Sequence, residues 1–178
     1  MRASAVDPEQ QRDWAVRVRA GATAAFEAVY RAYHVALWKY AYQFVHARDV
    51  AQDVVQDVFV DLWERRATLD IQRGLEAYLF IAVRNRALDT VRHETRVADV
   101  ANAGDVEAVA GVGAASLSDS TPTLPSDLDA AVTQIIAALR EPRRSILILR
   151  WKQGWQYDEI AEALGLSLSA VKMQVSRA

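Results

Sequence analysis

A long stretch without any aromatic or basic side chain divides this chain in two. Residues 97–127 consist largely of Ala, Val, Gly, Ser and Asp, with Pro122 and Pro125 near the end, and contain no Lys, Arg, Phe, Tyr or Trp. Such a composition is typical of a flexible linker, because it provides few large apolar side chains for a core. We therefore expect a first domain over residues 1–96, a flexible acidic linker over residues 97–127 and a second domain over residues 128–178.

Both expected domains show the periodicity of amphipathic helices. Apolar residues recur every three or four positions from Phe26 to Phe44, and similar patterns cover residues 49–66 and 74–92. Helical periodicity returns at Leu128 and continues to the last residue. Since no strand-like alternation of apolar and polar residues occurs, we predict an all-α fold of two small helical domains.

Charge is distributed unevenly along the chain, although its net value is only −2. Residues 65–96 carry seven Lys and Arg against four Asp and Glu, and residues 130–178 carry the same numbers. Residues 97–129 between them carry six acidic and no basic residues. Binding to phosphate depends on local positive potential rather than on the total charge. The two basic blocks therefore favour contact with nucleic acid.

The densest motif lies at residues 157–177 and predicts a helix-turn-helix. Ile160 and Ala161 give a first helix an apolar face, Gly165 suits a turn with positive φ, and Ser167 is placed to cap a second helix. A second helix of this kind fits the major groove of DNA. The residues expected to face DNA are Ser169, Lys172, Met173, Ser176 and Arg177, with Arg143 and Arg144 upstream available for the backbone. A plain helical hairpin with a glycine turn is the alternative interpretation.

Four aspartates at intervals of four residues place an acidic stripe on the helix expected over residues 49–66. They are Asp49, Asp53, Asp57 and Asp61, and Gln56, Phe59 and Trp63 lie beside them. An acidic surface with aromatic anchors suits docking on a basic protein surface. The alternative is a solvated helix face without a partner.

The segment over residues 78–96 interleaves aromatic and basic side chains. Tyr78 and Phe80 are followed here by Arg84, Arg86, Arg92 and Arg96, and Asn85 lies among the arginines. Basic and stacking groups together suit single-stranded or melted nucleic acid. Equally, Phe80 would belong to the core and the arginines would face solvent.

Catalytic and metal chemistry find little support in the residues. The chain has no cysteine, and its three histidines, His34, His46 and His93, show no metal-ligand spacing. There is no glycine-rich phosphate loop and no nucleophile motif, so we expect no cofactor and no enzymatic activity. No apolar run approaches the length of a bilayer span, and the first ten residues lack the apolar stretch of a secretion signal. We therefore expect a cytoplasmic protein without membrane insertion.

Four motifs together resemble a known family. They read AFEAVYRAY, AQDVVQDVFVDLW, AYLFIAVRNRALD and LREPRRSILILRWKQGWQYDEIAEALGLSLSAVKMQVSRA. In this combination the chain is similar to the extracytoplasmic-function sigma factors, which keep only sigma regions 2 and 4. The resemblance covers residues 14–96 and 128–178. It implies a promoter-reading subunit that binds core RNA polymerase, through the β′ clamp helices and the β flap, and promoter DNA, and that has an anti-sigma factor as a further partner.

The resemblance also implies roles for individual residues. Binding to the β′ clamp helices falls on Asp53, Gln56, Asp57, Phe59 and Trp63. Recognition of the −10 element falls on Asp70, Gln72, Arg73, Tyr78, Arg84, Asn85 and Arg92. Recognition of the −35 element falls on Arg143, Arg144, Ser169, Lys172, Met173, Ser176 and Arg177. The chain departs from the family at Asp57, where Glu is usual, at Tyr78, where Trp is common, and at Gln52, where an acid is frequent. Further basic residues usually follow the position of Ala178, so we expect weaker −35 binding or a longer natural chain.

A conventional helix-turn-helix regulator is the main alternative. Its N-terminal part would serve as a dimerisation or sensing bundle. Such a regulator has no need for an acidic-stripe helix followed by a helix rich in aromatic and arginine residues, whereas a sigma factor needs both. Co-purification with core polymerase would distinguish the two.

Overall fold

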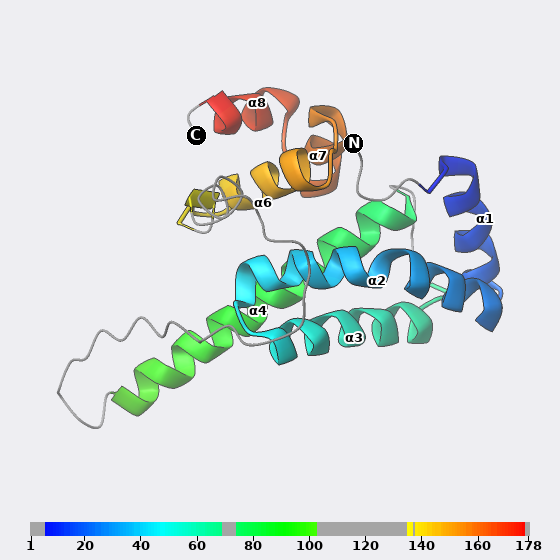
Figure 1. Ribbon diagram of the computed structural model, residues 1–178, viewed down its shortest axis with the longest axis horizontal. Helices are drawn as coiled ribbons and strands as arrows, with labels where there is room; N and C mark the ends of the chain where they lie inside the picture. Colours follow the sequence, from blue (N-terminus) through cyan, green and yellow to red (C-terminus); the bar gives the residue numbers. More distant parts are fainter. Residues whose placement is uncertain (1–5, 69–73, 103–134, 137, 177–178) are drawn as a thin grey trace, which may run out of the picture.

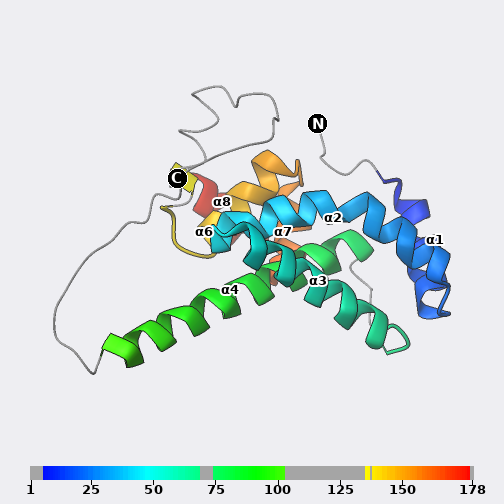
Figure 2. The same cartoon turned by 60° about the horizontal axis from the view of Figure 1, so that its bottom comes forward.

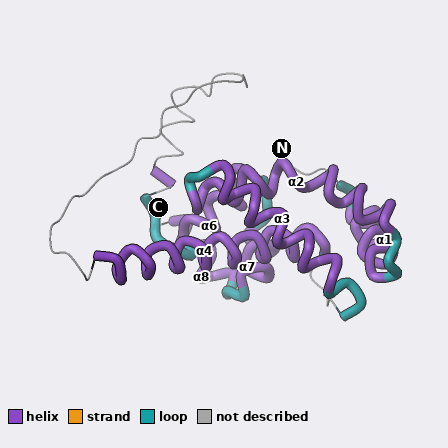
Figure 3. Tube along the Cα trace, turned by 90° about the horizontal axis from the view of Figure 1, so that it is seen from below, coloured by secondary structure: helices purple, strands orange, loops and turns teal. Residues whose placement is uncertain are grey.

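The computed structural model describes residues 6–68, 74–102, 135–136 and 138–176, and these are helical throughout except for turns and short connections (Figures 1 and 3). No strand occurs in these ranges, so the all-α prediction is confirmed. The elements in chain order are α1 (Pro8–Arg19), α2 (Thr23–Val45), α3 (Arg48–Glu64), α4 (Leu75–Asn102), α6 (Arg143–Leu147), a π-helical turn η1 (Ile148–Lys152), α7 (Tyr157–Leu164) and α8 (Leu168–Ser176).

Helices α1 to α4 form an N-terminal bundle. The predicted helices correspond to α2, α3 and α4, but α1 was not predicted. Its start nevertheless carries clear signals, because the Asp7 carboxylate accepts a hydrogen bond from the Glu9 amide and Pro8 occupies the first helical position. Val18 of α1 is buried in the bundle core.

The apolar stripes of α2, α3 and α4 face one another, as their periodicity predicts. The buried residues include Val29, Tyr33, Leu37, Val54, Val58, Leu62, Leu79 and Val83. Helix α4 continues to Asn102, well past residue 92, where the sequence pattern ended. Its C-terminal half projects away from the bundle (Figure 2), and residues 92–97 are exposed.

The C-terminal helices form the predicted helix-turn-helix. Gly165 ends α7 with a φ of +67°, and the Ser167 hydroxyl accepts a hydrogen bond from the Ala170 amide at 3.1 Å. A capping box between Gln156 and Glu159 fixes the start of α7. Val171 of α8 is fully buried against the preceding helices.

The apolar segment beneath α7 and α8 is buried over most of its length but not at its end. Residues Ser145 to Leu149 are buried, as an apolar segment requires, but Trp151 is 61% exposed. The segment winds into the π-helical turn η1, which is followed directly by a connection to α7. Trp155 of that connection is instead the buried tryptophan, at 2% exposure.

The two helical units pack against each other, which the sequence did not predict. In Figure 1, α6 to α8 lie along the same side of α2 and α4. Phe80 of α4 and Trp155 of the C-terminal unit form an edge-to-face ring pair with centroids 5.5 Å apart. The buried apolar residues therefore form one cluster that continues from the first unit into the second.

Candidate polymerase and nucleic-acid interfaces

The acidic stripe lies on the exposed face of α3. Asp49 and Asp53 are exposed, whereas Asp61 is only partly exposed. Asp57 is half exposed and forms an ion pair with Arg86 of α4, in which the Arg86 Nε lies 3.1 Å from the Asp57 carboxylate. This hydrogen bond and the Asp57 charge raise the pKa of Arg86. An acidic surface is thus present on α3, with Asp57 linked to the neighbouring helix.

The aromatic residues beside the stripe line a groove between α2 and α3. This apolar groove has a volume of about 550 Å³, and its lining includes Thr23, Phe26, Tyr30, Gln56, Phe59, Val60, Trp63 and Glu64. Phe59 is 3% exposed, so it forms part of the wall rather than a protruding anchor. Its ring lies 4.9 Å from Tyr30 and 5.9 Å from Phe26.

Trp63 is the aromatic residue of α3 that remains partly accessible. Its ring packs on Phe26 at 5.1 Å, and the guanidinium of Arg66 lies 4.4 Å from the ring centroid. Sequence reasoning missed Phe26 and Tyr30 as members of this surface. Their spacing of four residues on one helix face was a signal, but it equally indicated core positions.

On α4 the structure separates the aromatic residues from the basic ones. Phe80 is 1% exposed and contacts Tyr40 and Trp155, so of the two interpretations the core position is correct. Tyr78 is half buried, and burial together with the nearby Asp61 raises its pKa. A ladder of stacking rings available to melted DNA is therefore not present on this helix.

The polar residues assigned to the −10 element have different surroundings. Asn85 is exposed. Arg92 is exposed and forms a surface ion pair with Asp89 at 2.9 Å, a contact that contributes little in water. Arg96 also faces solvent. Asp70, Gln72 and Arg73 lie outside the described residues.

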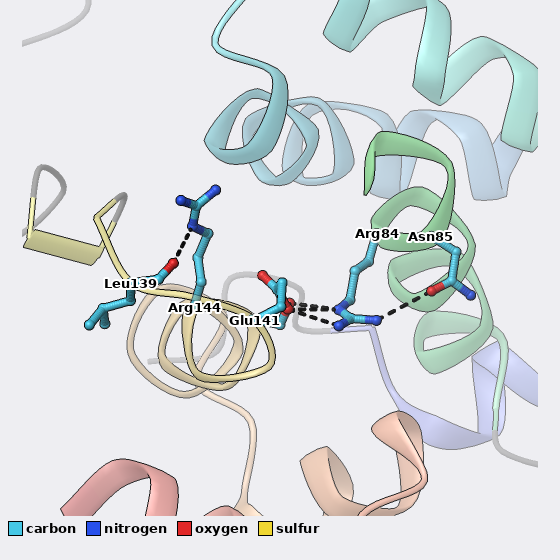
Figure 4. A network of polar contacts seen from close by, with 6 residues as sticks. Arg84, Asn85, Leu139, Glu141 and Arg144 are labelled. Carbon is cyan, nitrogen blue, oxygen red and sulfur yellow. Dashed lines mark hydrogen bonds and ion pairs between the residues drawn. The ribbon is translucent and has the colours of Figure 1, made fainter. Parts of the chain in front are cut away.

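Arg84 does not face solvent but binds residues of the C-terminal unit (Figure 4). Its Nη2 lies 2.8 Å from the Glu141 carboxylate, and its Nε donates to the Ser145 hydroxyl at 2.6 Å. A third, longer bond joins Arg84 to the side-chain oxygen of Asn85 at 3.3 Å. Only 18% of the Arg84 side chain is accessible. Sequence reasoning gave no role to Glu141.

The second helix of the helix-turn-helix presents a polar face to solvent. Ser169, Lys172 and Ser176 are exposed, and Met173 is 47% exposed. Arg177 lies outside the described residues. The outward direction of Lys172 agrees with the prediction.

The two arginines upstream of this helix are partly buried. The Arg143 Nε donates to the Gln174 side chain of α8 at 3.3 Å, and the Arg144 Nε donates to the Leu139 carbonyl at 3.1 Å (Figure 4). Arg143 therefore helps to hold α8 in place, and both guanidinium groups have partners within the protein.

The described part of the chain shows neither a metal site nor a membrane span. No group of three or more His, Asp or Glu side chains is placed there to hold a metal ion. None of the helices described has the length and apolar character needed to cross a bilayer.

These features of the described residues define a class: helical throughout, with an acidic, grooved face on one unit and a helix-turn-helix with an exposed second helix on the other. The family model for Sigma-70 region 2 matches residues 29–97, and that for Sigma-70 region 4 matches residues 129–178. The chain belongs to the sigma-70 family and is of the extracytoplasmic-function type.

Known proteins agree with this assignment. A relative from Xanthomonas campestris pv. campestris, described as "Probable RNA polymerase sigma factor RfaY", is 32% identical over 120 residues. That match covers 67% of this chain and 30% of the relative, so the chain spans less than a third of its length.

Two solved structures share the fold. The structure of CnrH in complex with the cytosolic domain of CnrY matches with a TM-score of 0.67 and 24% identity, over 95% of this chain and 92% of that one. The sigma factor RpoE of Bartonella quintana, in complex with the anti-sigma factor NepR, matches with a TM-score of 0.65 and 24% identity, over 85% and 90% respectively.

Proposed function

We propose that this protein binds core RNA polymerase and directs transcription initiation at promoters with matching −10 and −35 elements. The single observation that carries the proposal is the presence of sigma regions 2 and 4 in one chain. A protein that only bound duplex DNA would need region 4 alone. Its role is one of recognition in the cytoplasm, where polymerase works, and no step of catalysis is assigned to it.

The docking face on polymerase is assigned to the exposed side of α3 and the adjacent groove. Asp53 and Gln56 supply polar contacts from this side, and Trp63 at the groove rim supplies an apolar one. Asp57 joins them if its pair with Arg86 opens. Because Phe59 is buried, we assign it the role of shaping the groove, and the β′ clamp helices are the proposed partner.

Promoter reading is divided between the two units. Recognition of the melted −10 element is assigned to Tyr78, Arg84, Asn85 and Arg92 on α4, together with residues 70–73. A pocket that binds a flipped base offsets the free energy needed to extrude that base from the duplex. Helix α8 is assigned to the −35 element, with Lys172 as a basic contact from its exposed face. Contact with the DNA backbone is assigned to Arg143 and Arg144, which would have to exchange their bonds to the Gln174 side chain and the Leu139 carbonyl for a phosphate.

Neither unit needs to bind DNA tightly by itself. Mounting both on polymerase raises the effective concentration of the second site once the first is bound. Of the residues with a linker composition, 97–102 continue α4, and we assign the flexible connection to residues 103–127, which lie outside the described residues. Relatives in fold were solved with partners, one of them named an anti-sigma factor, and we propose a regulatory partner of that class here.

Charge reversal on α3 tests the docking assignment. Asp53→Lys should abolish retention of the full chain by immobilised core polymerase, because it places a cation where a basic partner surface is expected. Glu94→Lys makes the same charge change at an exposed position on the projecting end of α4 and should retain binding. Binding that survives Asp53→Lys, or is lost equally in both variants, would contradict the assignment.

A further inference from the structure

Helix α1 has no role in the proposed function, yet one of its side chains reaches the start of α4. The Gln11 Nε2 donates to the Glu76 carboxylate at 3.2 Å and to the Val6 carbonyl at 3.1 Å. The Gln11 Oε1 accepts a hydrogen bond from the Glu76 backbone amide at 3.4 Å. A single side chain therefore joins the first turn of α4 to a helix that precedes it by 65 positions.

The bond to the backbone replaces a helix cap that α4 cannot supply itself. Gly74 precedes the first residue of α4 and has no side chain, so it cannot accept the amide of the second or third helical residue, as a usual cap does. Glu76 is the second residue of α4, and its amide is one of those that the helix leaves without a partner. The Gln11 oxygen accepts this amide, so the start of α4 is completed from α1.

The bond to the carboxylate requires an uncharged donor at position 11. Glu76 is only 5% exposed, and a buried carboxylate needs hydrogen-bond donors to offset the loss of water. A second carboxylate at position 11 would oppose the Glu76 charge at hydrogen-bonding distance, which is unfavourable. Exchange of the Gln11 amide for an acid should therefore displace the start of α4.

This contact lies between two groups of residues that the proposed function assigns to the −10 element. Residues 70–73 are followed directly by Gly74, and the Tyr78 amide donates to the Gly74 carbonyl at 3.1 Å. Gly74 has a φ of +85°, which favours glycine. A Cβ built on Gly74 would lie 3.9 Å from the Gln11 Oε1. Gln11 thus borders the residue at which the −10 segment ends and α4 begins.

We infer that Gln11 is a positioning residue for recognition of the −10 element: it fixes the start of α4 and thereby the placement of the DNA-contacting residues on either side of Gly74. The inference rests on the proposed function, which assigns those residues to promoter DNA. Gln11 acts through Glu76 rather than by touching DNA. Its substitution therefore changes discrimination between DNA sequences, whereas docking on core polymerase through α3 does not depend on it.

Exchange of amide and acid between the two positions tests the inference. Gln11→Glu places a carboxylate against Glu76. Gln10→Glu is the matched control, because it makes the same change at the neighbouring, exposed position of α1. The double variant Gln11→Glu/Glu76→Gln again pairs one amide with one carboxylate and should rescue the effect, since residues in contact have non-additive effects.

Selection from random DNA provides the probe for this test. Holoenzyme assembled from core polymerase and the full, unsubstituted chain is mixed with single-stranded DNA of random sequence, and the retained strands are sequenced. The most enriched strand and a scrambled strand of the same composition are then labelled with fluorescein. Their affinities for each holoenzyme are measured by fluorescence anisotropy, and the ratio of the two affinities is the readout.

Gln11→Glu should lower this ratio by about twofold or more, the lower range of coupling between residues in contact. Gln10→Glu should leave the ratio unchanged, and the double variant should recover it. A merely structural role would reduce the amount of folded chain and lower both affinities by the same factor. Retention of each variant by immobilised core polymerase should equal that of the unsubstituted chain.

The outcomes separate this inference from the proposed function. An unchanged ratio in Gln11→Glu, or a lowered ratio that the double variant does not recover, would overturn the inference alone. Loss of core binding in Gln11→Glu would also overturn it, because Gln11 would then support the whole bundle. Enrichment of no sequence by the unsubstituted holoenzyme would contradict the proposed function, and the inference with it.

Discussion

Gly165 tests the helix-turn-helix most sharply, because its substitution has one physical consequence. Its φ of +67° lies in the left-handed region, and a Cβ built at this position meets nothing within 4 Å. Gly165→Ala therefore has no steric cost against neighbours and retains only the conformational cost of an L-residue in this region, about 1–2 kcal/mol. Gly165→Asn should cost less, since asparagine tolerates left-handed backbone.

Hydrogen exchange measured by mass spectrometry resolves this effect by segment. A loss of 1–2 kcal/mol corresponds to roughly 5- to 30-fold faster exchange for amides of α7 and α8 that open together. Amides of α3 serve as an internal control and should exchange as before. Unchanged exchange in α7 and α8, or an effect of Gly165→Asn as large as that of Gly165→Ala, would refute the assignment of a left-handed turn.

Three further predictions concern stability and its pH dependence. Ser167→Ala should destabilise α8 by about 1 kcal/mol, because the hydroxyl that caps the helix is lost. Ser167→Asp should keep the stability, because aspartate also caps helices. Chemical denaturation followed by circular dichroism compares the two variants. Phe80→Ala should cost about 3–5 kcal/mol as a buried aromatic truncation, and a cost below 1 kcal/mol in the same assay would contradict its core position. Burial and the nearby Arg144 lower the pKa of His46. Near the ordinary histidine pKa of about 6.5, the folded chain therefore binds fewer protons at this residue than the unfolded chain. The free energy of unfolding should fall as the pH drops below that value. Asparagine suits the φ of 54° at position 46. His46→Asn should therefore reduce the change in the urea midpoint of unfolding between pH 7.5 and pH 5.5. The same pH dependence in the variant would contradict the role given to His46.

Local signals predicted most of the secondary structure. Gly165 and Ser167 mark the end of one helix and the start of the next through properties of single residues, and both act as expected. The periodicity of α2 and α3 was sufficient to assign their buried faces. Helix α1 was missed although Asp7 and Pro8 are strong start signals, because its apolar face is short.

Contacts between segments distant in sequence could not be predicted. Arg84 and Glu141 are separated by 57 positions, and no local pattern distinguishes an arginine that pairs across an interface from one that faces solvent. For the same reason periodicity left two interpretations of Phe80 open. Its environment depends on Trp155, whose position follows from the packing of the two units rather than from α4.

The burial of Phe59 illustrates a related limit. Sequence spacing placed it beside the acidic stripe, and the structure confirms that it lies next to that face. Whether such a residue protrudes or forms a wall depends on the opposite helix, here on Phe26 and Tyr30. A docking surface is therefore predicted as a region more readily than as a set of contact residues.

In the proposed function, this chain gives polymerase its choice of promoter. The most direct test is to sequence the 5′ ends of transcripts made from genomic DNA by core polymerase with and without the full chain. We expect discrete start sites that depend on the chain, share sequences upstream at the −10 and −35 positions and disappear with Asp53→Lys. A transcript pattern that does not change when the protein is added would contradict the account.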